Sequence, residues 1–176
     1  MISLTPPDRG DDWVGLSDAT LPCGAAADWV VLPSCGAVVS FSGTSRDHSG
    51  QPGASDERTG VTTLEYEAYD DHVEPRLREI AAELRRRWPD TGRVVLLHRV
   101  GEVPVGSSSV LVVVSAPHRD TAFEAARFGI DAIKATVPVW KREVWDGGSA
   151  WGLDAHDIED VARLDDRVSS GPRGAT

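Results

Sequence analysis

Lysine, cysteine and long apolar runs are scarce in this sequence of 176 residues. The two cysteines, Cys23 and Cys35, do not form a C-x-x-C pair and have no partners at metal-ligand spacing, so no disulfide framework is indicated. No apolar run approaches the roughly 20 residues that span a bilayer. The first ten residues contain two prolines and no apolar segment, which is not the pattern of a secretory signal. We therefore expect a cytoplasmic protein whose cysteines stay reduced.

Positive charge is also in short supply. The chain has 18 Lys and Arg against 28 Asp and Glu, a formal net charge of −10. Nucleic acid and membrane surfaces are therefore not expected as partners, because both are anionic. An anionic ligand could be bound only where the few cations gather. Only two of the basic residues are lysines, Lys134 and Lys141, which makes their positions informative.

The composition that remains is that of a globular protein. Hydrophobic residues make up 40% of the chain and charged residues 26%. The length fits one domain with a buried core. Alternating or β-branched apolar segments predict strands over residues 37–41, 62–69, 93–100, 110–115 and 139–144. Helical spacing of apolar residues predicts helices over about residues 71–88 and 121–137, and residues 25–31 are expected to form a short helix or turn. This irregular mixture of strands and helices favours an α+β fold.

The ends of these elements carry further signals. Residues 1–20 are polar and rich in Pro and Asp, which predicts a frayed start. Residues 43–60 are rich in Gly, Ser and charge, which predicts a long surface loop. Val137-Pro138 should end the last helix, because a residue before proline avoids the α conformation. Two pairs have the spacing of a capping box at a helix start: Asp71 with Glu74, and Thr121 with Glu124.

The sequence allows two different environments for the side chain of Lys134. It lies about 40° from Ile130 around the predicted helix, within the apolar stripe. Such a lysine is either partly buried, which suits a nucleophile or general acid/base, or extended into solvent at the helix C-terminus. The pattern alone favours the second alternative. Lys141 follows beyond Pro138, where the chain can turn back, so both amines could face one pocket. Lys141 could equally belong to a solvated charge cluster.

Arg46, His118 and Arg119 complete a candidate anion site. His118-Arg119 lies between a predicted buried strand and a helix N-terminus, where free backbone N–H groups attract anions. Arg46 follows another strand in the same way. Ordinary loop polarity would explain these residues equally well. The residues thus indicate a small anion site without specifying a reaction.

Several common site motifs are absent from the sequence. The loop around Arg46 lacks the Walker A spacing of a phosphate-binding loop. There is no G-x-S-x-G elbow, and no G-x-G-x-x-G follows a predicted strand. The five histidines are not spaced as zinc ligands. These absences argue against a hydrolase of the elbow class, a dinucleotide-binding protein and a zinc enzyme.

Five segments, in order and at similar spacing, resemble the signatures of the molybdopterin synthase catalytic (large) subunit family: Gly36–His48, Leu64–Tyr69, Arg93–Gly101, Ser115–Ala125 and Lys134–Glu143. The last segment reads Lys-x-x-x-Pro-x-Trp-Lys-Arg-Glu and is the most specific. Together they span about residues 35–151, roughly two-thirds of the chain. The resemblance divides the chain into a weakly matched segment (1–28), the family domain (29–152) and an acidic, flexible tail (153–176). It also marks residues 53–60 as an enlargement of the loop after His48.

The resemblance implies a fold, partners and a reaction. The fold would be an α/β-hammerhead-type single domain with a mixed, mainly antiparallel sheet and flanking helices. The chain would form a homodimer and bind two small ubiquitin-like sulfur carriers, giving a heterotetramer. Each carrier ends in a Gly-Gly thiocarboxylate, and its sulfur converts cyclic pyranopterin monophosphate into molybdopterin. No cofactor is implied, because the carrier supplies the sulfur.

The resemblance also assigns roles to individual residues. Lys134 and Lys141 match the catalytic lysines of the family. Arg46, His118 and Arg119 match residues that bind the anionic groups of the substrate, some of them across the dimer. Two other interpretations remain open at this point: a persulfide sulfurtransferase with Cys35 as nucleophile, and a non-catalytic module that only docks the carrier.

Overall fold

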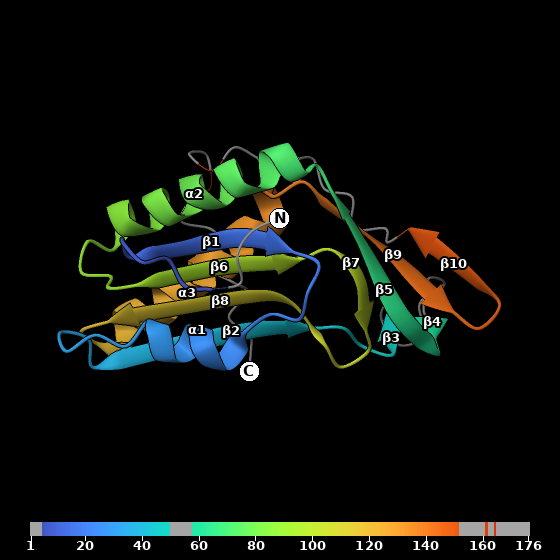
Figure 1. The fold of residues 1–176 in the computed structure, drawn as a ribbon, viewed down its shortest axis with the longest axis horizontal. Helices are drawn as coiled ribbons and strands as arrows, with labels where there is room; N and C mark the ends of the chain where they lie inside the picture. The colour runs from blue at the N-terminus through green and yellow to red at the C-terminus, as the bar shows by residue number, and fades with distance from the viewer. Residues whose placement is uncertain (1–4, 50–57, 152–160, 162–163, 165–176) are drawn as a thin grey trace, which may run out of the picture.

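A computed structural model describes residues 5–49, 58–151, 161 and 164, which fold into two four-stranded sheets, a two-stranded pair and three helices (Figure 1). The helices are α1 (Cys23–Trp29), α2 (Asp70–Arg87) and α3 (Arg119–Thr136). The strands are β1 (Asp12–Ser17), β2 (Ala37–Thr44), β3 (His48–Ser49), β4 (Arg58–Thr59), β5 (Val61–Ala68), β6 (Val94–Arg99), β7 (Gly101–Pro104), β8 (Ser108–Ala116), β9 (Val139–Trp145) and β10 (Gly148–Trp151). The predicted α+β class is confirmed.

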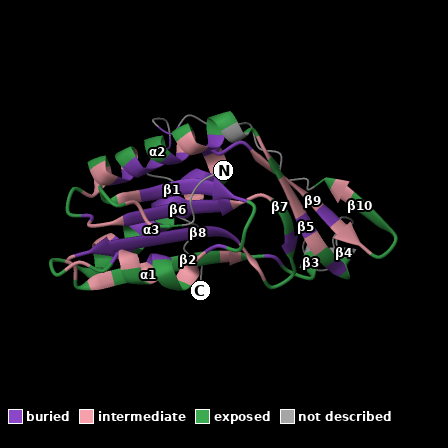
Figure 2. Cartoon of the chain, viewed as in Figure 1, coloured by how far each residue is buried: buried purple, intermediate pink, exposed green. Residues whose placement is uncertain are grey.

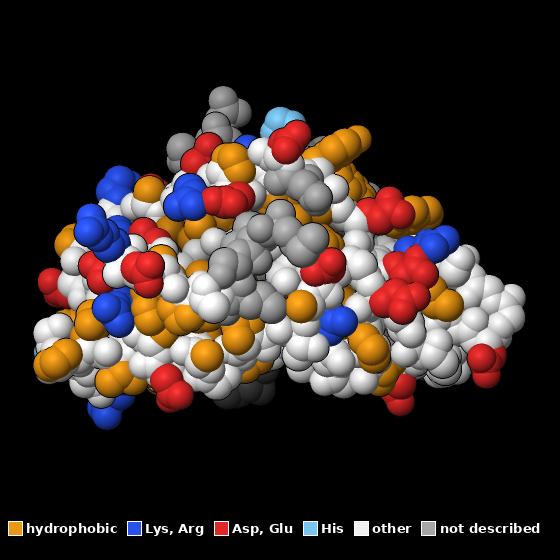
Figure 3. All heavy atoms as spheres, viewed as in Figure 1, with side chains coloured by type: hydrophobic (Ala, Val, Ile, Leu, Met, Phe, Trp, Pro, Cys, Tyr) orange, Lys and Arg blue, Asp and Glu red, His pale blue; other side chains and the backbone are white. Residues whose placement is uncertain are grey.

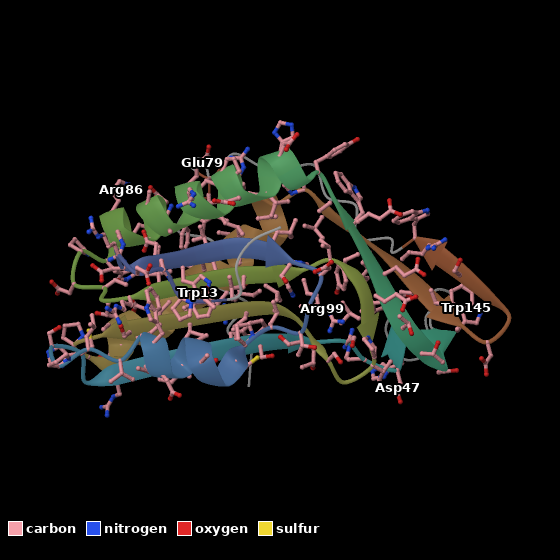
Figure 4. The ribbon with its side chains drawn as sticks, in the orientation of Figure 1. Trp13, Asp47, Glu79, Arg86, Arg99 and Trp145 are labelled. Carbon is pink, nitrogen blue, oxygen red and sulfur yellow. The ribbon has the colours of Figure 1, made fainter. Side chains whose placement is uncertain are left out.

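The first sheet has the strand order β1-β6-β8-β2 and holds the main core. Strands β1 and β6 are parallel, and the other pairs are antiparallel. Side chains alternate between the two faces of β8: Val112 and Val114 pack with α2 and α3, whereas Leu111 and Val113 pack with α1. Trp13 fills the space under α1 (Figure 4). The prediction that β8 is covered on both faces is confirmed.

The second sheet is antiparallel throughout, with the order β10-β9-β5-β7. Its core is small and consists of Val61, Leu64 and Val103, with Tyr66 packed against it. Figure 2 shows the contrast: buried residues dominate the first sheet, whereas exposed and half-buried residues dominate the second. A sheet with so little core of its own depends on its connections to the first sheet.

Several expectations about local structure were wrong. The segment expected to fray contains β1, whose Trp13 and Val14 are buried against β6 and the helices. The expected loop after β2 contains the short pair β3–β4. Neither expected capping box forms: α2 begins at Asp70 and α3 at Arg119, and neither has a side-chain cap. Strands β7 and β10 were not predicted, because four-residue strands carry too short a pattern.

The connection between α3 and β9 places the candidate residues. Helix α3 ends at Thr136, and Val137 is extended (φ −84°, ψ 125°) because Pro138 follows it. The chain then enters β9, which lies between β10 and β5 in the second sheet (Figure 1). In the part of the chain that the structure describes, no helix is long and apolar enough to span a membrane.

A cationic cavity between the two sheets

A cavity of about 760 Å³ lies where the two sheets meet. Its walls come from the end of β2, the start of β8, the last turns of α3 and the facing strands β5 and β9. The volume falls within the range of small-molecule sites. Three of the five candidate site residues line it: Arg46, Lys134 and Lys141.

Lys134 occupies the last turn of α3, with Ile130 and Ile133 beside it in the cavity wall. Its side chain is exposed. The partial burial considered for Lys134 is therefore wrong for a single chain, and the alternative of a solvent-exposed lysine at a helix C-terminus is correct. The amine nevertheless faces the cavity, and the partial negative charge of the helix end favours a cation there.

Lys141 enters the cavity from β9 and is paired with a buried carboxylate. Its Nζ lies 3.5 Å from Oε1 of Glu143, and the exposed fractions of the two side chains are 27% and 4%. Residues two apart on a strand point to the same face, so the pair shares one wall of the cavity. The turn at Pro138 thus brings both lysines to one cavity, as the proline in the sequence allowed.

Arg46 sits at the rim, between β2 and β3. The preceding residue anchors this loop: Ser45 is buried and its Oγ donates to the carbonyl oxygens of Pro104 (2.6 Å) and Ser107 (3.3 Å). Asp47 turns away toward His48, whose Nδ1 lies 2.7 Å from Oδ1 (Figure 4). This hydrogen bond holds the pKa of the Asp47 carboxyl below its ordinary value. The Asp47 carboxylate, next to Arg46 in the sequence, is therefore hydrogen-bonded to His48.

His118 and Arg119 do not line the cavity of the same chain. They begin α3, whereas Lys134 ends it, and 15 residues of helix separate Arg119 from Lys134 by about 22 Å. Both side chains are exposed, and within the described part of the chain the ion-pair contact of Arg119 is a long one, 3.8 Å to Asp120. A five-residue anion site within one chain is therefore wrong, because the helix that carries Lys134 also keeps His118 and Arg119 away from it.

Sequence reasoning missed three residues of the cavity wall: Glu143, Tyr66 and His98. Glu143 was treated as part of a charge cluster, although its position two residues after Lys141 on a strand indicates a shared face. Tyr66 donates from its hydroxyl to Oγ of Ser109 at 3.3 Å. His98 is a buried imidazole that follows four aliphatic residues on β6, and a polar residue continuing such a run was the signal available.

The distribution of charge sets the cavity apart from the surface around it. Figure 3 shows acidic side chains gathered over the second sheet on the viewed face. The cavity wall instead has two lysines and an arginine against one carboxylate, Glu143. No group of three or more His, Cys, Asp or Glu is arranged to hold a metal ion among the residues that the structure describes. Cys35 does not line the cavity either. The arrangement is suited to binding an anionic organic ligand.

Comparisons with known proteins agree on one family. Residues 16–136, more than half of the chain, match the family model described as MoaE protein. The molybdopterin synthase catalytic subunit of Taeniopygia guttata is 36% identical over 144 residues, covering 82% of this chain and 88% of that protein. The crystal structure of molybdopterin synthase from Staphylococcus aureus is similar with a TM-score of 0.69 and 32% identity, covering 78% of this chain and 95% of that one.

A more distant neighbour shares the fold. It comes from the complex of subunits 1 and 2 of molybdopterin-converting factor of Helicobacter pylori, with a TM-score of 0.64, 17% identity, and coverage of 85% of this chain and 95% of that one. Identity this low supports the fold alone. The family model and the more similar relatives carry the assignment, and on that basis this chain belongs to the MoaE protein family.

Proposed function

We propose that this chain is the catalytic subunit of a molybdopterin synthase and transfers sulfur to cyclic pyranopterin monophosphate. The observation that supports this most directly is the convergence of Lys134, Lys141 and Arg46 on one cavity in an acidic protein. These are three of the residues that the family resemblance assigns to catalysis and substrate binding. The relatives that share the fold are named for the same activity.

The chemistry requires cations at two places. The substrate carries a phosphate, and the sulfur donor is the anionic thiocarboxylate at the end of a carrier protein. In each transfer the thiocarboxylate sulfur forms a bond to a substrate carbon as a C–O bond of that carbon breaks, and the oxygen leaves as water or as a phosphate oxygen. Water then attacks the acyl carbon and the acyl C–S bond breaks, so the sulfur stays on the substrate and the carrier leaves as a carboxylate. Lys134 acts on this step as proton shuttle or transient acyl acceptor. Lys141, held by Glu143, stabilises the developing oxyanion or the phosphate.

The partner is a small ubiquitin-like carrier with a C-terminal Gly-Gly. A tail of two glycines has no side chains, so it can enter a narrow opening and still leave room for the pterin. The neighbour from Helicobacter pylori belongs to a complex of two subunits, which is the kind of assembly proposed here. The carrier's thiocarboxylate would enter the cavity near Lys134.

A second copy of this chain would supply the missing residues. Strand β2 is an edge of the first sheet: β8 pairs with one side, and no strand that the structure describes pairs with the other. Val38 and Phe41 are exposed on it, with 41% and 37% of their surface accessible. A long edge strand with exposed apolar side chains is a template for pairing with another strand.

Two-fold pairing along β2 has a specific consequence for the site. The cavity lies at the Thr44 end of β2, whereas His118 follows Ala116, which pairs with Ala37 at the other end. The ends are about 24 Å apart. Strands related by a two-fold axis run antiparallel, so each cavity would face the opposite end of the partner. His118 of the partner subunit and the partner's Arg119 would then approach the rim at Arg46.

Reconstitution tests the proposed function. The protein is mixed with a thiocarboxylated carrier and cyclic pyranopterin monophosphate, and molybdopterin is measured. We expect product with the wild type, loss of turnover in Lys134→Ala and Lys141→Ala with the carrier still bound, and normal turnover in Arg127→Ala. Arg127 is a matched control, because it lies on the exposed face of α3 and pairs with Asp131.

Two outcomes would contradict the proposal. Near-wild-type turnover in Lys134→Ala would show that Lys134 is not catalytic. Stoichiometric carrier binding by the wild type without any product would favour the docking-module interpretation. Retained activity in Cys35→Ser would eliminate the persulfide mechanism.

A further inference from the structure

His98 is a buried imidazole that the mechanism above does not use. It is the last residue but one of β6, pairs with Leu16 on one side and Val110 on the other, and has 7% of its surface exposed. The four residues before it on the strand are Val or Leu. A polar ring in such a strand needs hydrogen-bond partners or an opening, because a buried polar atom without a partner is costly. His98 has one partner and one opening, since it also lines the cavity.

The partner fixes which nitrogen carries the proton. Nδ1 of His98 lies 2.8 Å from the carbonyl oxygen of Arg99. A carbonyl oxygen can only accept a hydrogen bond, so Nδ1 is the protonated nitrogen and Nε2 keeps its lone pair. Burial lowers the pKa of His98 to about 4, against a smaller opposing effect of this hydrogen bond. The imidazole is therefore neutral near pH 7, and its Nε2 is an acceptor.

The acceptor nitrogen is directed at the cavity. Among the residues that the structure describes, none hydrogen-bonds Nε2, yet it does not belong to the fully buried polar atoms that lack a partner. The neighbouring Tyr66 ring packs edge-on at 5.3 Å and 71°. Its hydroxyl is committed to Ser109, whose Oγ in turn donates to the carbonyl oxygen of Gly43 at 3.1 Å. Tyr66 therefore does not satisfy Nε2, and the cavity is the remaining direction.

This nitrogen differs chemically from the cationic groups in the wall. Arg46, Lys134 and Lys141 can only donate hydrogen bonds and attract any anion, including inorganic phosphate. The carboxylate of Glu143 is engaged by Lys141. A neutral acceptor does not attract anions, but it can pair with the N–H or O–H of a heterocycle. It thus distinguishes a pterin phosphate from a simple phosphate.

We propose that His98 is a specificity-determining residue of this cavity, whose Nε2 accepts a hydrogen bond from a ring N–H or O–H of the bound pterin. The inference rests on the proposed function, because it assumes that the pterin occupies this cavity. His98 orients the ring, while the cations bind the anionic groups. A site that hydrogen-bonds a ligand group loses affinity when either partner is removed, by about tenfold for a neutral pair.

Calorimetric titration with cyclic pyranopterin monophosphate tests this role. We expect His98→Leu to raise the Kd about tenfold, and His98→Gln to recover most of the affinity, because its amide oxygen can replace Nε2. Binding of inorganic phosphate and of the carrier should be unchanged in both variants. His72→Leu is the matched control, because His72 is exposed on α2.

Equal pterin affinity in the wild type and His98→Leu would overturn the inference, as would an equal loss of pterin and phosphate binding in both His98 variants. A second measurement needs no substitution. In the ¹⁵N-labelled wild type, the Nε2 resonance of His98 should shift with the pterin but not with inorganic phosphate, and a resonance unmoved by the pterin would contradict the role. If the wild type bound no pterin, the proposed function itself would be contradicted, and so would the role of His98 that rests on it.

Discussion

Lys141 and Glu143 show that the environment of a charged residue depends on its partner in the fold. In the sequence, Lys141-Arg142-Glu143 has the appearance of a surface charge cluster. On β9 the chain alternates: Lys141 and Glu143 face the cavity, whereas Arg142 pairs with Glu65 of β5. A buried carboxylate is costly unless paired, so the position of Glu143 makes sense only together with the lysine. The carboxylate fixes Lys141 and leaves Lys134 as the more accessible amine.

His98 also makes a prediction about acid stability at the residue scale. Its pKa is about 4 in the folded protein and 6.5 as an unperturbed residue, so the unfolded state takes up a proton first as the pH falls. The folded state is therefore favoured fully above pH 6.5, and this advantage is lost between pH 6.5 and about 4. Relative to His98→Gln, the wild type should lose about 3 kcal/mol across this window.

Urea unfolding at several pH values measures this difference. His72→Gln serves as the control for an exposed histidine and should follow the wild type. If wild type and His98→Gln lose stability in parallel between pH 6.5 and 4, the imidazole is not held neutral by burial.

At the scale of elements, α2 combines a buried face with an arginine-rich last turn. Val73, Leu77, Ile80 and Leu84 are fully buried, whereas Glu79 and Arg86 lie on the outer face (Figure 4). Helices α2 and α3 were predictable because their apolar residues repeat at helical spacing over several turns. Their starts lie within one or two residues of the predicted positions, but the expected side-chain caps do not form. Glu124, expected to cap α3, instead accepts a hydrogen bond from Nε1 of Trp88 and links the two helices.

Glu83 should stabilise α2 more than a typical surface acid does. Its carboxylate accepts hydrogen bonds from Arg86 and Arg87, with 13% of the side chain exposed. The bond from Arg86 is the largest cause of its pKa falling from 4.5 to about 2. Glu83→Gln should therefore lower the free energy of unfolding at pH 7 by about 1 kcal/mol. The difference should hold above pH 4.5 and disappear as the pH falls toward 2.

Chemical denaturation of both proteins across this pH range would measure the effect. Glu79→Gln is the comparison, because Glu79 pairs only with Arg76 among the interactions described and has 57% of its side chain exposed. Equal effects of the two substitutions would mean that the double arginine contact adds nothing.

At the scale of the whole molecule, the proposed site residues are divided between the two ends of one long α3 helix. Lys134 and Arg119 cannot reach the same ligand from one chain, so a site that uses both residues needs the proposed dimer. Mixed dimers test it. Lys134→Ala and Arg119→Ala should each be inactive alone, whereas a mixture after subunit exchange should regain about a quarter of the sites, since half of the dimers are mixed and each has one intact site.

Ser40→Lys provides the matching control for the interface. Ser40 is exposed at the middle of β2, where the two copies would lie closest, and two lysines there would repel each other. This substitution should yield a monomer by light scattering and prevent complementation, whereas Val31→Lys, an exposed valine outside β2, should not. A dimer that survives Ser40→Lys would place the interface elsewhere, and an inactive mixture of intact dimers would refute the shared site.

Local pattern by itself determined the long elements and the identity of the key cations. The apolar repeats of α2, α3, β5, β6 and β8 are dictated by burial of one face or both, and Pro138 ends a helix in any context because of its ring. The scarcity of lysine drew attention to Lys134 and Lys141, and the motifs around them indicated the family. The strand in the N-terminal segment was hidden, because its burial depends on β6, about 80 residues away in the chain.

Only the tertiary structure decided which of these residues share a site. Sequence spacing says nothing of distance once a chain leaves its own helix or strand, so the five candidate residues separated into three at the cavity and two at the far end of α3. The same folding brought Glu143 and His98 into the wall, where burial pairs one with a lysine and keeps the other neutral. Burial and long-range contact are properties of the packed molecule. They determine which candidate residues lie at the cavity and keep the His98 imidazole neutral, and neither can be read from local sequence.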